Sequence, residues 1–199
     1  MRNFRKFLLC GMFLAIPASA YALPETFTAS LSGLNESPPN GSAGTGSATV
    51  IFDLAANSME VMVSFSGLSG TTTASHIHCC TLVPFTGTAG VATTSPTFTG
   101  FPLGVTSGTY DHTFDMTMAS SYNAPFITAA GGTVAQAETL LYDDMFTGQE
   151  YLNIHTSVVP GGEIRGFLVP VPEPAGLAIF GAGLLAALRL KRRSGNKAA

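Results

Sequence analysis

The sequence predicts an all-β domain of short antiparallel strands, on two observations. Apolar and polar residues alternate in several short runs, such as Met59–Leu68, where Met59, Val61 and Val63 share one face. Stretches rich in turn-forming residues separate these runs, and Ala55–Ser58 between two of them has the composition of a hairpin loop. A period of two places every second side chain on the same face of a strand, so one face of the sheet can form a core.

The strands are predicted in order along the chain. They cover Phe27–Leu31, Ser47–Leu54, Met59–Leu68, Thr109–Met118, Tyr151–Thr156 and Glu163–Leu168. Pro160–Gly162 separates the last two and predicts a turn, which would make these strands an antiparallel pair. Residues 84–108 contain five Gly and three Pro, so this stretch is predicted to be mostly loop.

One short helix is predicted after Thr133. Thr133 and Gln136 fit the capping-box pattern, in which the first residue accepts a hydrogen bond from the backbone of the second. Apolar residues then recur at helical spacing as far as Met145, and Gly148 suits the position just past a helix end. The prediction is a helix of about three turns within an otherwise β-rich chain.

Residues 1–22 have the three parts of a secretory signal peptide. Three basic residues lie within the first six positions, an apolar run of ten follows at Phe7–Ile16, and small-residue cleavage sites end at Ala20 and Ala22. The apolar run is shorter than the roughly 20 residues that span a bilayer, although an N-terminal anchor remains the alternative. Cleavage by signal peptidase would remove Cys10 with the leader.

Residues 171–199 also have three parts. Val171 precedes Pro172, Glu173 and Pro174, a run of fourteen uncharged residues follows, and the basic sequence RLKRR comes next. This order resembles the PEP-CTERM sorting signal of bacteria that make exopolysaccharide. The resemblance implies recognition by an exosortase, cleavage near the Pro-Glu-Pro motif, and transient insertion of the apolar transmembrane helix into the inner membrane. Delivery to the periplasm, cell envelope or outside would follow, with an ordinary tail anchor as the alternative.

Residues 23–170 between these ends are long enough for one domain with its own core. Arg165 is the only Lys or Arg in this range, against eleven Asp and Glu, so its net charge is −10. A single cation excludes nucleic-acid binding by phosphate neutralisation. The negative charge favours solubility and the binding of cations.

Three segments together resemble the CHRD domain, first described in chordin. They are Ala74–His78, Asn153–Thr156 and Pro160–Gly166, and the resemblance covers most of Thr26–Leu168. It implies an extracellular, immunoglobulin-like or related antiparallel β-sandwich, and it supplies no established activity. The chain departs from the plain form of the domain by carrying two cysteines directly after the His-x-His sequence.

The histidines are candidate metal ligands. His76 and His78 lie in Ala74–Cys80, which is predicted to end a strand in a sharp turn. Both imidazoles would leave the same face, with their Cα atoms about 6.5 Å apart. His155, on another predicted strand, would supply a third nitrogen, and such a site suits copper or zinc. Metal binding would weaken as the pH falls below about 6, because ligation needs neutral imidazole. The alternative is a structural role, in which the rings bond loop carbonyls. His112 has no visible partner.

Cys79 and Cys80 would be the only cysteines of the exported chain. An oxidising destination favours a disulfide between them, although adjacent cysteines close only a small ring that departs from ordinary disulfide geometry. Metal thiolates and free or intermolecular thiols are the other interpretations. A disulfide here would be a rigid corner or a reducible switch beside the histidines.

Glu163 and Arg165 lie two positions apart on a predicted strand. As the only cation of the domain, Arg165 suits a structural ion pair or a clamp on carbonyl groups, and substrate binding is the alternative. No nucleophile elbow, Walker loop or paired-carboxylate motif is present. The sequence therefore predicts a non-enzymatic binding or structural module of the envelope or extracellular matrix, with exopolysaccharide or other matrix components as partners. The alternative is an exported copper or zinc protein with redox activity.

Overall fold

A computed structural model describes residues 23–172 and contains eight strands, two α-helices and two single 3₁₀ turns. The strands are β1 (Glu25–Ser32), β2 (Thr45–Asp53), β3 (Ser58–Ser66), β4 (Thr72–His78), β5 (Gly108–Asp115), β6 (Tyr151–Thr156), β7 (Ile164–Phe167) and β8 (Val169–Pro170). The helices are α1 (Ala124–Ala129) and α2 (Val134–Met145), and the turns are Gly33–Asn35 and Ala119–Ser121. The predicted all-β antiparallel class is confirmed.

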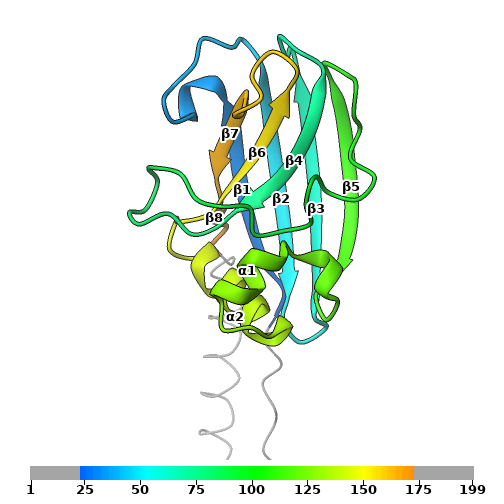
Figure 1. Cartoon of the computed structure of the whole chain (residues 1–199), viewed down its shortest axis with the longest axis vertical. Coiled ribbons are helices and arrows are strands. Elements are labelled where there is room, and N and C mark those ends of the chain that lie inside the picture. Colours follow the sequence, from blue (N-terminus) through cyan, green and yellow to red (C-terminus); the bar gives the residue numbers. More distant parts are fainter. Residues whose placement is uncertain (1–22, 173–199) are drawn as a thin grey trace, which may run out of the picture.

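The strands form one hydrogen-bonded antiparallel sheet with the order β4-β6-β7-β1-β2-β3-β5, and β8 pairs with β1. The sheet curls, so that β4, β6 and β7 lie in front of β1, β2 and β3 in Figure 1. Inward side chains from both halves meet in one core. Its fully buried members include Phe27, Val50, Phe52, Met59, Val61, Ile77, Leu152, Ile154 and Ile164.

The long connection between β4 and β5 covers the edge of β4. Within it, Ala92 donates to the carbonyl of Ile77, Phe98 to that of Ser75, and Gly104 to that of Thr72, each at 2.9 Å. An uncovered edge strand invites pairing with other chains, so this loop protects the sheet. The predicted loop at 84–108 is therefore a structural cover of β4, because its backbone supplies the hydrogen bonds that a neighbouring strand would have made.

The local pairings predicted from the sequence are confirmed. β2 and β3 form an antiparallel hairpin across the predicted loop, with Asp53 opposite Ser58. β6 and β7 are antiparallel across the predicted turn, with Ile154 opposite Ile164. The side chain of Thr133 accepts from the backbone nitrogen of Gln136 at 3.3 Å, as a helix cap does.

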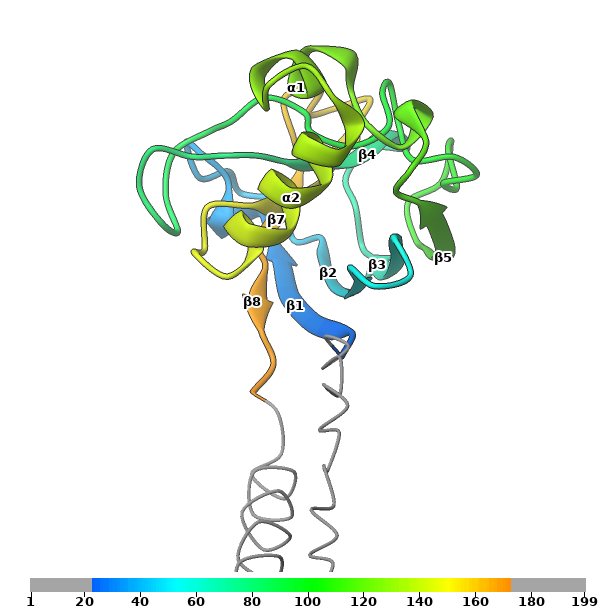
Figure 2. The ribbon, with the colours of Figure 1, turned by 90° about the horizontal axis from the view of Figure 1, so that it is seen from below.

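The structure has two short helices where the sequence predicted one. The additional helix, α1, has six residues and a proline in its first turn. Six residues are too few to show the repeated spacing by which a helix is recognised in a sequence. Figure 2 shows α1 and α2 together, covering one end of the sheet.

The roles of the two chain ends, a signal peptide and a sorting signal, are predicted from the sequence. The predicted signal peptide at 1–22 lies outside the described residues, and so do Glu173 and Pro174 of the sorting motif with the apolar run that follows. Within residues 23–172, none of the helices has the length and apolar character needed to cross a bilayer.

Replacing Gly166 with alanine is expected to destabilise the domain. A Cβ atom at this position of β7 would meet the carbonyl carbon of Ser30 at 2.9 Å and its oxygen closer still, and backbone atoms of β1 cannot easily move away. Overpacking of this kind costs about 1–3 kcal/mol, to be measured by urea denaturation. Gly161→Ala is the matched control, because nothing lies within 4 Å of its Cβ position. Equal stability of the two variants would contradict this account of the β1–β7 contact.

Candidate metal centre

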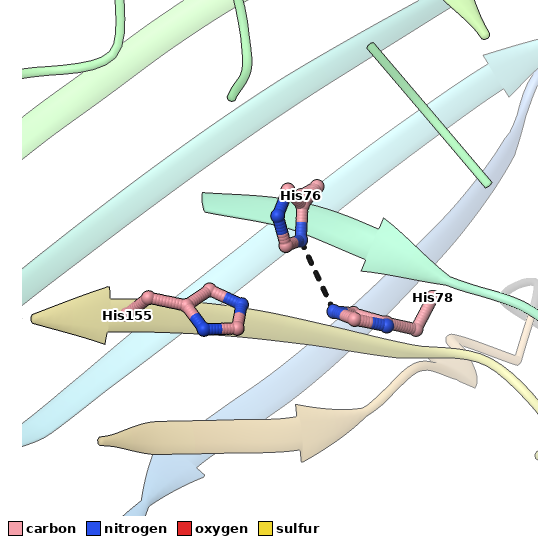
Figure 3. Close-up of side chains that lie close together, drawn as sticks. All are labelled: His76, His78 and His155. Carbon is pink, nitrogen blue, oxygen red and sulfur yellow. Dashed lines mark hydrogen bonds between the residues drawn. The ribbon is translucent and has the colours of Figure 1, made fainter. Parts of the chain in front are cut away.

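Three histidines meet on the outer face of the β4–β6 pair. The strand register places His76 opposite Asn153 and His155 opposite Ala74, so the rings of neighbouring strands point the same way. The His76 ring centroid lies 4.8 Å from that of His78 and 4.7 Å from that of His155. The centroids of His78 and His155 are 6.0 Å apart. Figure 3 shows the three rings converging from the two strands.

The ring nitrogens come within reach of a single ion. One nitrogen from each of His76, His78 and His155 can be chosen so that all three lie within 4.8 Å of one another. The Nδ1 atom of His76 is 3.1 Å from Nε2 of His78, the contact drawn as a dashed line in Figure 3. Nitrogen ligands about 2.0–2.1 Å from one metal ion lie within roughly 4 Å of each other, so only small ring movements would be needed.

The remaining nitrogens of two rings are held by backbone carbonyls. Nδ1 of His78 donates to the carbonyl of Ala89 at 2.8 Å, and Nδ1 of His155 donates to that of Pro160 at 2.8 Å. A carbonyl only accepts, so both rings carry their proton on Nδ1 and direct an Nε2 lone pair towards the cluster. The Nε2 atom of His155 is buried and has no hydrogen-bond partner among the described residues.

Burial keeps these imidazoles neutral. It lowers the pKa of His76 to about 3, with the neighbouring His78 and His155 acting in the same direction. Burial also lowers the pKa of His78 to about 4 and lowers the pKa of His155, although the Ala89 and Pro160 carbonyls oppose it. Protons therefore compete for the lone pairs only at a pH lower than the value of about 6 expected for ordinary histidines.

A stack of side chains supports the cluster from β6 and β7. Tyr151 lies parallel to the His78 ring, with centroids 4.7 Å apart and 7° between the planes. The Cζ atom of Arg165 is 4.5 Å from the Tyr151 ring centroid, a cation–π contact. The Tyr151 hydroxyl accepts from the backbone nitrogen of Ala89, whose carbonyl holds His78. Tyr151 therefore positions His78 directly and through the Ala89 loop.

Arg165 pairs with Glu36, and not with Glu163. The Arg165 Nε atom is 3.8 Å from a Glu36 carboxylate oxygen, and the guanidinium donates to the carbonyls of Asn35 and Gly87. Burial raises the pKa of Glu36 to about 7, against the lowering effect of Arg165. The guanidinium thus contacts both an acid and loop carbonyls. The sequence had no signal for Glu36, since only the folded chain brings the loop after β1 beside β7.

Glu163 has a different set of partners. Its carboxylate accepts from the hydroxyl of Ser42 at 2.6 Å, the backbone of Ser69 at 2.6 Å, the backbone of Gly70 at 3.2 Å and the hydroxyl of Thr156 at 2.6 Å. Burial opposes its ionisation, but these hydrogen bonds prevail and lower the pKa of Glu163 to about 2. Glu163 thereby links the loop before β2 and the loop before β4 to Thr156 at the end of β6.

The other sequence candidates lie outside the cluster. Cys79 and Cys80 follow β4 at once, and their sulfur atoms lie at bonding distance. His112 lies on β5 against the aromatic rings of Tyr110 and Phe114, away from the other histidines. The structure therefore brings together His76, His78 and His155, and it leaves His112 as a packing residue of β5.

These features define a class of protein, an antiparallel β-domain with a cluster of three histidines, two of them buried. The family model of the CHRD domain matches residues 27–168, so the chain belongs to the CHRD domain family. The model of the PEP-CTERM protein-sorting motif matches residues 170–193, so this is an exported protein sorted through an exosortase. Its destination is the cell envelope or the extracellular space. No curated protein and no solved structure matches the chain.

Proposed function

We propose that this exported CHRD domain is a metal-binding module of the cell envelope or extracellular matrix, which holds a copper or zinc ion on His76, His78 and His155. The observation that carries the proposal is the buried Nε2 atom of His155, which faces the cluster without a hydrogen-bond partner among the described residues. Three nitrogen ligands leave a fourth position of a tetrahedral ion open for water or a matrix ligand. The lack of catalytic sequence motifs favours a binding role over an enzymatic one.

The hydrogen bonds that orient the histidine rings favour a metal site over a purely structural cluster. The carbonyls of Ala89 and Pro160 accept hydrogen bonds from the Nδ1 atoms of His78 and His155. Proteins usually orient metal-binding imidazoles in this way. A purely structural cluster would explain those two bonds. It would leave the His155 Nε2 lone pair buried without a donor, and an unmet buried polar atom costs about 1–3 kcal/mol.

Metal binding is expected to raise the melting temperature of the protein. The chain is purified from its own host, stripped with a chelator, and heated with and without added copper or zinc. An ion at 100 times its dissociation constant stabilises the folded state by about 2.7 kcal/mol, which corresponds to roughly 5–10 °C for a domain of this size. Calcium at the same concentration is the control, since imidazole is a poor ligand for it.

The same protein preparation provides a second readout. Elemental analysis of unstripped protein should find close to one equivalent of copper or zinc per chain, and it identifies which of the two the cell supplies. A stripped protein whose melting temperature changes with neither ion, and which carries neither ion from its host, would overturn the proposal and favour a purely structural cluster.

A further inference from the structure

The opposite side of the β4–β6 pair carries a second group of metal-ligand side chains. His78, the last residue of β4, lies opposite Tyr151, the first residue of β6, so Cys79 and Glu150 are the residues just beyond the paired ends. Side chains alternate between the two faces of a strand, which directs Cys79 and Glu150 away from the histidines. Cys79 belongs to the hydrophobic core and Glu150 is fully buried.

Asp144, near the end of α2, joins this group. Its Oδ2 atom is 3.8 Å from the sulfur of Cys79, and one ligand atom each from Cys79, Cys80 and Asp144 can be chosen within 4.8 Å of one another. Burial raises the pKa of Glu150 well above its usual value, and the nearby Asp144 carboxylate raises it further. One acid and two sulfur atoms therefore lie close together, and Glu150 is near enough to Asp144 to feel its charge.

Glu150 is the independent sign that something binds here. Both of its carboxylate oxygens are buried and find no hydrogen-bond partner among the described residues. Arg165 is the only Lys or Arg in residues 23–172, and it is already engaged by Glu36 and two loop carbonyls. A buried carboxyl without a partner costs free energy unless a cation or a donor compensates it. A metal ion on Asp144 would bring positive charge close to Glu150.

We propose that Cys79, Cys80, Asp144 and Glu150 form a second, redox-controlled site that binds zinc when the two cysteines are reduced. In the oxidised protein the two sulfur atoms are bonded to each other and the site is closed. Two molecules of a small thiol donate two electrons and two protons to that bond, become one disulfide, and leave two protonated cysteine side chains. Zinc then displaces both thiol protons to solvent and binds the two sulfur atoms and the carboxylate oxygens, which are ligand types that zinc accepts.

This site is independent of the three-histidine site. The two groups share no side chain, because the histidines lie within β4 and β6 and the other group lies beyond the paired ends of these strands and in α2. Zinc would therefore bind to the reduced protein at two places, and to the oxidised protein at the histidines alone. The disulfide and the metal thiolates are then two states of one site.

Cobalt(II) is the probe that separates the two sites. Cobalt substitutes for zinc and gives an intense near-ultraviolet charge-transfer band only when a thiolate is a ligand, so histidine-bound cobalt does not contribute. The full chain carries Cys10→Ser, which leaves Cys79 and Cys80 as its only thiols. We expect the band in protein reduced by a phosphine and none in oxidised protein. Zinc added afterwards should abolish the band.

Variants test the two acids. Glu150→Gln is expected to weaken cobalt binding at the thiolate site by roughly 10-fold or more. The matched control is Glu138→Gln, because Glu138 of α2 is also a buried acid with an unpartnered oxygen, and this variant should leave the band unchanged. His155→Ala should likewise retain the band, which keeps the result separate from the proposed histidine site.

A measurement on the unaltered cysteine pair avoids any dependence on how variants fold. Zinc should protect both thiols of the reduced Cys10→Ser chain from an alkylating reagent, which intact-mass measurement detects as a missing double adduct. Reduced protein that shows no charge-transfer band, or full alkylation in the presence of excess zinc, would overturn the proposal. A band of equal strength and affinity in Glu150→Gln would overturn the role of Glu150.

Discussion

Replacing His155 with alanine is expected to lower the affinity for copper or zinc by about 100-fold or more, since loss of even an indirect support of a metal site costs 10- to 100-fold. The variant removes one of three nitrogens and leaves His76 and His78 on the same strand. Competition with a chromophoric chelator measures the change. His155 is the most informative position because it comes from a different strand, so the test depends on the tertiary arrangement.

His112→Ala is the matched control for this variant. It removes the same type of side chain from β5, where the ring packs against Tyr110 and Phe114 and not against the other histidines. The control should bind metal as the parent protein does. Unchanged affinity in His155→Ala, or equal losses in both variants, would contradict a site built from His76, His78 and His155.

Replacing Glu163 with glutamine is expected to lower the free energy of unfolding by about 2–4 kcal/mol, because hydrogen bonds to a buried charged group are lost and a donor is left unmet. Both oxygens of Glu163 are occupied by donors, among them the backbone nitrogens of Ser69 and Gly70. The amide group of glutamine would face one pair of those donors with a donor of its own. Urea denaturation measures the loss, with the half-buried Glu60→Gln on β3 as the control.

The contribution of Glu163 should also depend on pH with a definite sign. The hydrogen bonds lower its pKa to about 2 in the folded protein, against an ordinary value of 4.5. The unfolded chain therefore takes up the proton first as the pH falls. The stabilisation is complete above pH 4.5 and is lost as the pH falls from there towards about 2.

The difference in stability between the parent protein and Glu163→Gln should shrink over that range. A difference that stays constant there would show that the charge of Glu163 is not responsible.

Several features of this protein were determined by sequence alone, because their causes are local. The hairpin of β2 and β3 follows from period-two alternation on either side of a turn-forming tetrapeptide. The start of α2 follows from Thr133 and Gln136, which are three residues apart. The shared face of His76 and His78 follows from their spacing, since residues two apart on a strand always point the same way. Export and sorting could also be predicted from the sequence, because a sorting signal is a linear motif.

Other features were decided only by the tertiary structure. The partner of Arg165 is Glu36, the acid beside Cys79 is Asp144, and the ring that stacks on His78 is Tyr151. Each of these contacts joins segments that are far apart in the sequence. Local pattern predicts that a strand exists and which way its side chains alternate, but it does not determine which strand lies beside it or in what register.

The histidine cluster depends on both the local spacing of residues and the tertiary structure. Spacing placed His76 and His78 on one face, and the β4–β6 register then brought His155 to within 4.7 Å of His76 between ring centroids. The carbonyls of Ala89 and Pro160, which fix the rings, come from loops and carry no side-chain signal at all. Backbone groups are the same at every residue, so only the folded path of the chain can decide which carbonyl meets which ring.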